Sequence, residues 1–63
     1  MRRMRNERIA NGWTQKHVAA CVGITKAAVC DIETGRRNPS YEVLVKLEDL
    51  FRMNHRELMA QSK

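Results

Sequence analysis

One local pattern for starting a helix occurs four times in this chain. At each place a Thr, Ser or Asn follows a bulky apolar or proline residue, and an apolar residue stands four positions further on. The side-chain oxygen of such a residue can accept a hydrogen bond from a free amide in the first helical turn, and the flanking pair has the spacing of a hydrophobic staple. The four candidate caps, each with its flanking pair, are Thr14 with Trp13 and Val18, Thr25 with Ile24 and Val29, Ser40 with Pro39 and Leu44, and Asn54 with Met53 and Leu58. The repetition predicts four short helices, and a fifth is expected over about residues 2–11, before Gly12.

No segment alternates apolar and polar residues over the length of a strand. The segment after Ser40 has the clearest helical periodicity. Its apolar face consists of Val43, Leu44, Leu47, Leu50 and Phe51. A chain of 63 residues is one domain, and it buries only about 60% of its unfolded surface, which leaves little room for an enclosed ligand site. We predict an all-α fold, a compact bundle of five short helices in one domain over residues 1–63, with no cofactor and no small-molecule ligand.

Charge is unevenly distributed along the chain. Residues 1–40 carry eight basic and three acidic side chains, a net charge of +5, whereas residues 41–63 carry four of each. A basic front half on a neutral support predicts a surface that binds a polyanion. No apolar run approaches the roughly 18 residues of a membrane helix, and two cysteines do not make a disulfide framework. We therefore expect a reduced cytoplasmic protein without a membrane anchor or secretory signal.

The segment 15–34 carries the most specific local pattern. It predicts a helix of about eight residues, a turn at Gly23 and a second helix that ends before Gly35. Gly23 can take the positive φ of a sharp turn, and the small Ala19 lets the second helix cross closely. Apolar residues stand where the two helices would meet, at Val18, Val22, Ile24, Val29 and Ile32. This arrangement is a helix-turn-helix unit.

With these residues in place, the chain resembles the phage repressor and Cro family of helix-turn-helix regulators, also called XRE-type regulators. The resemblance covers about residues 4–60. It depends on GWTQ (12–15), the spacing of Ala19, Gly23, Val29 and Ile32, IETGRRNPS (32–40) and VLVKLEDLF (43–51). It implies a regulator, typically a repressor, that acts as a homodimer on a near-palindromic operator in double-stranded DNA. The neutral C-terminal helices are the expected dimer surface, around Phe51, Met53, Leu58 and Met59, and some of these residues are expected to fill the monomer core instead.

The second helix of the unit, residues 25–34, is the predicted recognition helix, whose first residues meet base edges in the major groove. Those residues are Thr25, Lys26 and Ala27, with Asp31 one turn further on. Lys26 can donate to guanine, Asp31 can accept from cytosine N4, and Ala27 can contact a thymine methyl group. Because this helix has few amide side chains, DNA shape is expected to supply part of the specificity.

Other positions are assigned to the DNA backbone or to structure. Gln15 begins the first helix of the unit, where free amides favour a phosphate. The resemblance places Gln15, Thr34, Arg36, Arg37 and Asn38 along the DNA backbone. It also implies a salt bridge between Arg8 and Glu33, which would stabilise little if it were exposed.

Several alternatives stay open at this point. Within the same class, the chain could be a restriction–modification controller or an antitoxin-like autoregulator. From another class, it could be a protein-interaction module on a helix-turn-helix scaffold, or an RNA binder, although its three aromatic residues offer little for base stacking. Salt-dependent binding to a specific duplex would discriminate between these classes.

Catalytic and metal chemistry have little support in the sequence. We expect no enzyme, because no nucleophile–base set or carboxylate pair is apparent. His17 and Cys21 have the i, i+4 spacing of two metal ligands and Cys30 could add a third, but a zinc site needs four, so no metal is predicted. Cys30 could sense oxidation, since it lies on the predicted recognition helix.

Overall fold

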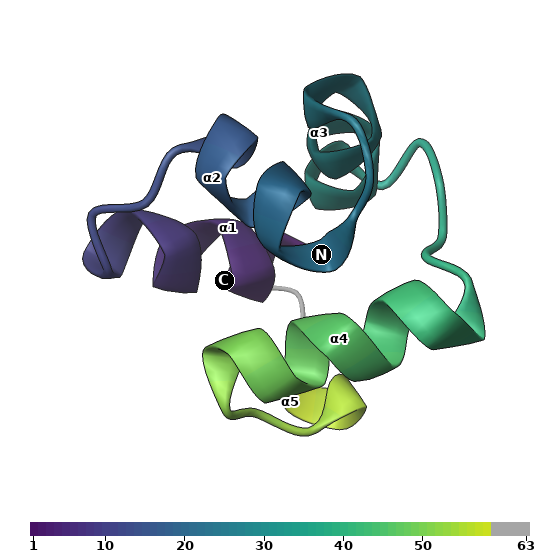
Figure 1. Ribbon diagram of the computed structural model, residues 1–63. Coiled ribbons are helices and arrows are strands. Elements are labelled where there is room, and N and C mark those ends of the chain that lie inside the picture. The colour runs from purple at the N-terminus through teal and green to yellow at the C-terminus, as the bar shows by residue number, and fades with distance from the viewer. Residues whose placement is uncertain (59–63) are drawn as a thin grey trace.

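The computed structural model describes residues 1–58, and this part of the chain contains five helices and no strand (Figure 1). They are α1 (Arg2–Ala10), α2 (Gln15–Val22), α3 (Lys26–Thr34), α4 (Tyr41–Phe51) and α5 (His55–Leu58). In Figure 1, α2 and α3 form the upper part of the molecule, and α4 lies below them with α5 against it. The first helix, α1, packs against α3, α4 and α5. The predicted all-α bundle of five short helices is confirmed.

All four predicted caps form in the structure. The side-chain oxygens accept from the backbone amide three residues later, with donor–acceptor distances of 3.0 Å for Thr14 and Thr25, 3.3 Å for Ser40 and 2.9 Å for Asn54. Each cap satisfies one of the amide groups that have no partner inside their own helix. The local sequence therefore determines where α2 to α5 begin.

The helices α2 and α3 each end in a left-handed glycine, and α1 is followed by another, Gly12, with φ 73°. Gly23 has φ 76° and Gly35 has φ 85°. After Gly23 and Gly35 the chain makes the long hydrogen bond of a Schellman motif, from Ile24 N to Ala19 O at 3.0 Å and from Arg36 N to Asp31 O at 2.8 Å. The first of these turns sets the angle between α2 and α3.

The core is assembled from all five helices. Met4, Val18, Val29, Leu47 and Leu58 have no exposed surface. Trp13, Ile24 and Met53, each directly before a helix cap, pack against this cluster. This packing is expected for the first residue of a hydrophobic staple. Although α5 has only four residues, Leu58 anchors it in the common core.

The core shows which residues of the expected dimer surface remain available for a partner. Phe51 is 8% exposed and Leu58 is fully buried, so these two residues fill the monomer core instead of presenting a face to a partner. Met53 is half-buried, and Met59 lies outside the described residues. The apolar side chains that α4 does expose are Tyr41, at 81%, and Val45, at 36%. The periodicity of the sequence predicted the apolar face of α4 correctly. It could not show which residues near that face are buried and which are exposed.

Across the described range, the helices are too short or too polar to cross a bilayer.

Candidate nucleic-acid interface

The centre of the site is the crossing of α2 and α3. Ala19 is 4% exposed and lies in the core with Val22 of its own helix and Val29 and Ile32 of α3. A methyl side chain at this crossing lets the two helix backbones approach closely, while the inner face of α3 is sealed by apolar residues. The outer face of α3 is thereby held away from the core and toward solvent.

A buried carboxylate ties this crossing to α1. Glu33 accepts from Arg8 Nε at 2.7 Å and from Arg8 Nη2 at 3.3 Å, and its side chain is 1% exposed. The remaining Arg8 nitrogen, Nη1, donates to the carbonyl of Trp13 at 2.9 Å. The Arg8 side chain is 12% exposed, so the pair is buried and not the weak exposed pair considered above. It connects α1, the α1–α2 turn and α3.

The start of α3 is exposed. Thr25, Lys26 and Ala27 all face solvent, and Asp31 is half-buried one turn later. The Thr25 hydroxyl oxygen accepts from Ala28 N at 3.0 Å, and its proton can still be donated outward. The structure therefore brings three of the four predicted base-contacting residues to one exposed helix end, with Asp31 less accessible than they are.

The predicted backbone-contacting residues fall into two groups. Arg36, Arg37 and Asn38 are exposed in the loop after α3. Two polar side chains are already engaged within the protein. Gln15 Nε2 donates to Glu33 at 3.1 Å, and the Thr34 hydroxyl lies 3.0 Å from the Cys30 carbonyl of its own helix. A contact from Gln15 would then use its second amide N–H or the free backbone amides at the start of α2.

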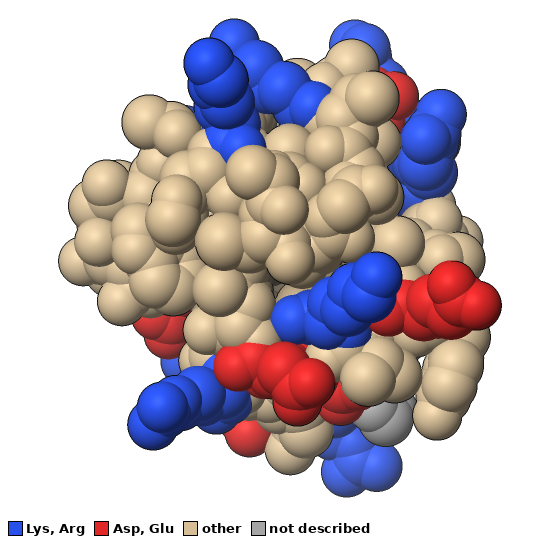
Figure 2. Space-filling model, in the orientation of Figure 1, with Lys and Arg blue, Asp and Glu red and all other residues tan. Residues whose placement is uncertain are grey.

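Positive charge borders this surface. Figure 2 shows Lys and Arg side chains at the edge of the molecule over α2 and α3, with little acidic surface between them, whereas both signs are interspersed over α4. A groove of about 620 Å³ lies among the first three helices. Its basic lining residues are Arg5, Arg8, Lys16 and Lys26.

Arg5 and Lys16 were not identified from the sequence. The available signal was the i, i+3 spacing of Arg5 and Arg8, which places both on one face of α1.

The cysteines do not form a metal centre. Cys21 Sγ lies 3.6 Å from His17 Nε2 on the exposed side of α2, while Cys30 is half-buried on α3. Among residues 1–58, no three His, Cys, Asp or Glu side chains come together in a way that could hold a metal ion.

Taken together, the short glycine turn, the close α2–α3 crossing and the exposed end of α3 define a helix-turn-helix protein. The family model described as helix-turn-helix matches residues 4–58. The chain belongs to the helix-turn-helix family, and the resemblance found in the sequence is confirmed.

Two relatives refine this assignment. The HTH-type transcriptional regulator AnsR of Bacillus subtilis (strain 168) is 34% identical over 61 residues, an alignment that covers 97% of this chain and 53% of AnsR. The chain thus spans about half the length of that relative. The crystal structure of the restriction-modification controller protein C.AhdI from Aeromonas hydrophila matches with a TM-score of 0.81 and 33% identity, covering 92% of this chain and 88% of that one.

Proposed function

We propose that this protein binds double-stranded DNA at a specific sequence and regulates transcription, with α3 in the major groove. The observation that carries the proposal is the exposed start of α3, together with the cation of α2 beside it and the basic loop at 36–38. A helix placed in the major groove needs this combination, because base edges are read by its tip while the flanking cations meet phosphates. The names of the two relatives, a transcriptional regulator and a controller protein, support the same function.

Roles for the individual side chains follow from this docking. Lys26 reads a guanine, and Thr25 and Ala27 contact neighbouring base edges. The half-buried Asp31 contacts a base only if its side chain turns outward from α3. Arg36, Arg37 and Asn38, together with Thr34 and the start of α2 at Gln15, follow the DNA backbone. None of these roles needs a cofactor or a catalytic step, and the protein acts in the cytoplasm, where the DNA lies.

The test compares a base-reading variant with a phosphate-contacting one. Lys26→Ala should weaken binding by about 1–3 kcal/mol at one base pair and relax discrimination there. Arg37→Ala should weaken binding to all duplexes alike and reduce the salt slope by about one unit. Lys46→Ala is the matched control, since Lys46 is exposed on α4, away from the site. Fluorescence anisotropy with duplexes selected from a random pool measures all three, and equal affinities for every protein would refute the docking.

We further propose that the protein binds its operator as a homodimer through the C-terminal helices. One recognition helix reads too few base pairs to select a site, and two copies one helical turn apart solve this problem. The exposed Tyr41 and Val45 of α4 offer an apolar patch for the contact. The helix α4 lies in the part of the chain whose net charge is zero, so two copies do not repel there. Sedimentation with a palindromic operator should give a complex of two chains per duplex, and a 1:1 complex at protein excess would refute the dimer.

A restriction–modification controller is the second candidate role. The match to C.AhdI extends over 88% of that chain, whereas the match to AnsR extends over 53% of its length. Sequencing of genomic fragments bound by the purified protein would decide between these roles. A controller should select a site beside restriction and methyltransferase genes, and a regulator of another kind should not.

A further inference from the structure

The groove among the first three helices is lined by four cations, and in the part of the chain that the structure describes only one of them is paired with a carboxylate. Of the four cations that line it, Arg8 is neutralised by Glu33. The other three, Arg5, Lys16 and Lys26, each come from a different helix and are exposed. Within residues 1–58 none of these three has a carboxylate at ion-pair distance. The groove therefore has an uncompensated positive charge that a bound anion would balance.

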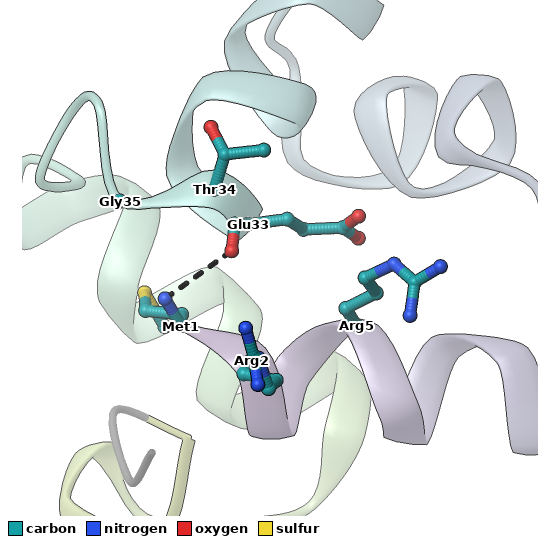
Figure 3. Close-up of a pocket in the computed structure, with 6 residues that line it drawn as sticks. All are labelled: Met1, Arg2, Arg5, Glu33, Thr34 and Gly35. Atoms are coloured by element: carbon teal, nitrogen blue, oxygen red, sulfur yellow. Dashed lines mark hydrogen bonds between the residues drawn. The ribbon is translucent and has the colours of Figure 1, made fainter. Parts of the chain in front are cut away.

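Arg5 is the cation shared by two neighbouring grooves. It lines the first groove and also a second one of about 450 Å³, beside the C-terminal end of α3. Figure 3 shows Arg5 rising from α1 toward α3 next to the Glu33 side chain, with Arg2 one turn earlier on α1. Arg5 thus lies between the two grooves, alongside the helix that is proposed to read the bases.

Several properties of the groove favour a phosphate as the anion. The first turns of α2 and α3 contribute Lys16 and Lys26 to its wall, and free amides at helix starts add positive partial charge. Arg5 presents a planar guanidinium, which matches phosphate oxygens in pairs. The groove also adjoins the exposed tip of α3, so a DNA strand that flanks the occupied major groove would pass beside it.

We propose that Arg5, together with Lys16, binds a phosphate of the DNA strand beside the recognition helix, so that α1 is a third DNA-contacting helix. This inference rests on the proposed DNA-binding function and adds a contact to it. It assigns Arg5 to affinity and docking geometry, and not to the reading of bases.

The experiment measures the salt dependence of binding for Arg5→Gln. Loss of one phosphate contact should lower the slope of log K against log salt by about 0.9 for each chain in the complex. The affinity deficit relative to the wild type should then shrink by about 3.5-fold per bound chain between 0.05 M and 0.2 M salt. Arg3→Gln is the matched control, because it removes the same charge from the same helix, and Arg3 pairs with Glu7 at 3.5 Å and lines neither groove.

A chemical change in the DNA completes the test. Replacing single phosphates of the bound duplex by neutral methylphosphonates should identify one position in each half-site where the wild type loses affinity and Arg5→Gln does not. Equal slopes for Arg5→Gln and Arg3→Gln, or the same methylphosphonate profile for Arg5→Gln and the wild type, would refute the Arg5 contact while specific binding by the wild type still stands. Failure of the wild type to prefer any duplex would instead refute the proposed function.

Discussion

Removal of the Glu33 side chain should destabilise the fold strongly. Glu33→Ala eliminates the acceptor of three N–H groups, two from Arg8 and one from Gln15, and leaves Arg8 with only the Trp13 carbonyl. Since the Arg8 side chain is 12% exposed, its charge is then mostly buried without a counter-ion. Breaking such a pair costs about 3–5 kcal/mol, and a domain of 63 residues has only about 3–9 kcal/mol of stability in total.

Thermal unfolding followed by circular dichroism measures this loss. At about 4–8 °C per kcal/mol for a domain of this size, Glu33→Ala should lower the melting temperature by about 12 °C or more, or leave the chain unfolded. The control is Glu7→Ala, which breaks the ion pair with Arg3. That pair has side chains 46% and 32% exposed, so its removal should cost less than about 1 kcal/mol.

A double variant keeps the reasoning testable if Glu33→Ala does not fold. Replacing both partners by apolar residues, Arg8→Met with Glu33→Leu, removes the buried charge together with its counter-ion and should recover most of the stability. A Glu33→Ala protein that melts as high as Glu7→Ala would show that burial of the pair does not govern its energy. A double variant less stable than Glu33→Ala would lead to the same conclusion.

Four further variants test other parts of the structure. Ala19→Leu should lower the melting temperature through an overpacking cost of about 1–3 kcal/mol at the α2–α3 crossing, and an unchanged melt would contradict the close approach there. Gly23→Ala should lower the free energy of unfolding by about 1–2 kcal/mol through its positive φ alone, because an added Cβ meets no atom within 4 Å. Arg52→Gly should raise it by up to about 1 kcal/mol, since Arg52 has φ 54°. Urea titrations measure both changes. Replacing Tyr41 and Val45 together by Arg should abolish two-to-one binding in sedimentation without lowering the monomer's melting temperature, and an unaffected complex would place the dimer contact elsewhere.

Helix starts were predictable because each depends on a few adjacent residues. A Thr, Ser or Asn at the cap and its flanking apolar pair are visible in the sequence, and all four caps formed. The end of α4 was harder, because Arg52 takes the left-handed conformation that glycine provides at Gly23 and Gly35. A residue without that conformational signature gives no warning in the sequence.

Contacts between distant segments were less predictable. The hydrogen bond of Gln15 to Glu33 joins residues 18 apart, and nothing near Gln15 in the sequence indicates it. The grouping of Arg5 with Lys16 and Lys26 likewise depends on how α1 lies against α2 and α3. The apolar face of α4 was evident, but only the packing of the whole bundle shows that Phe51 is buried against Trp13 while Tyr41 is exposed.

The single tryptophan of the chain gives this fold an intrinsic optical probe. Trp13 lies at the junction before α2, where its ring is 5.4 Å from that of His17 and 5.6 Å from that of Phe51 on α4. Its fluorescence therefore reports whether α4 is docked on the helix-turn-helix unit, whereas far-ultraviolet dichroism reports helix content alone. In a domain that unfolds as one cooperative unit the two signals change at the same denaturant concentration, so detachment of α4 ahead of the other helices would be seen as an earlier change in emission.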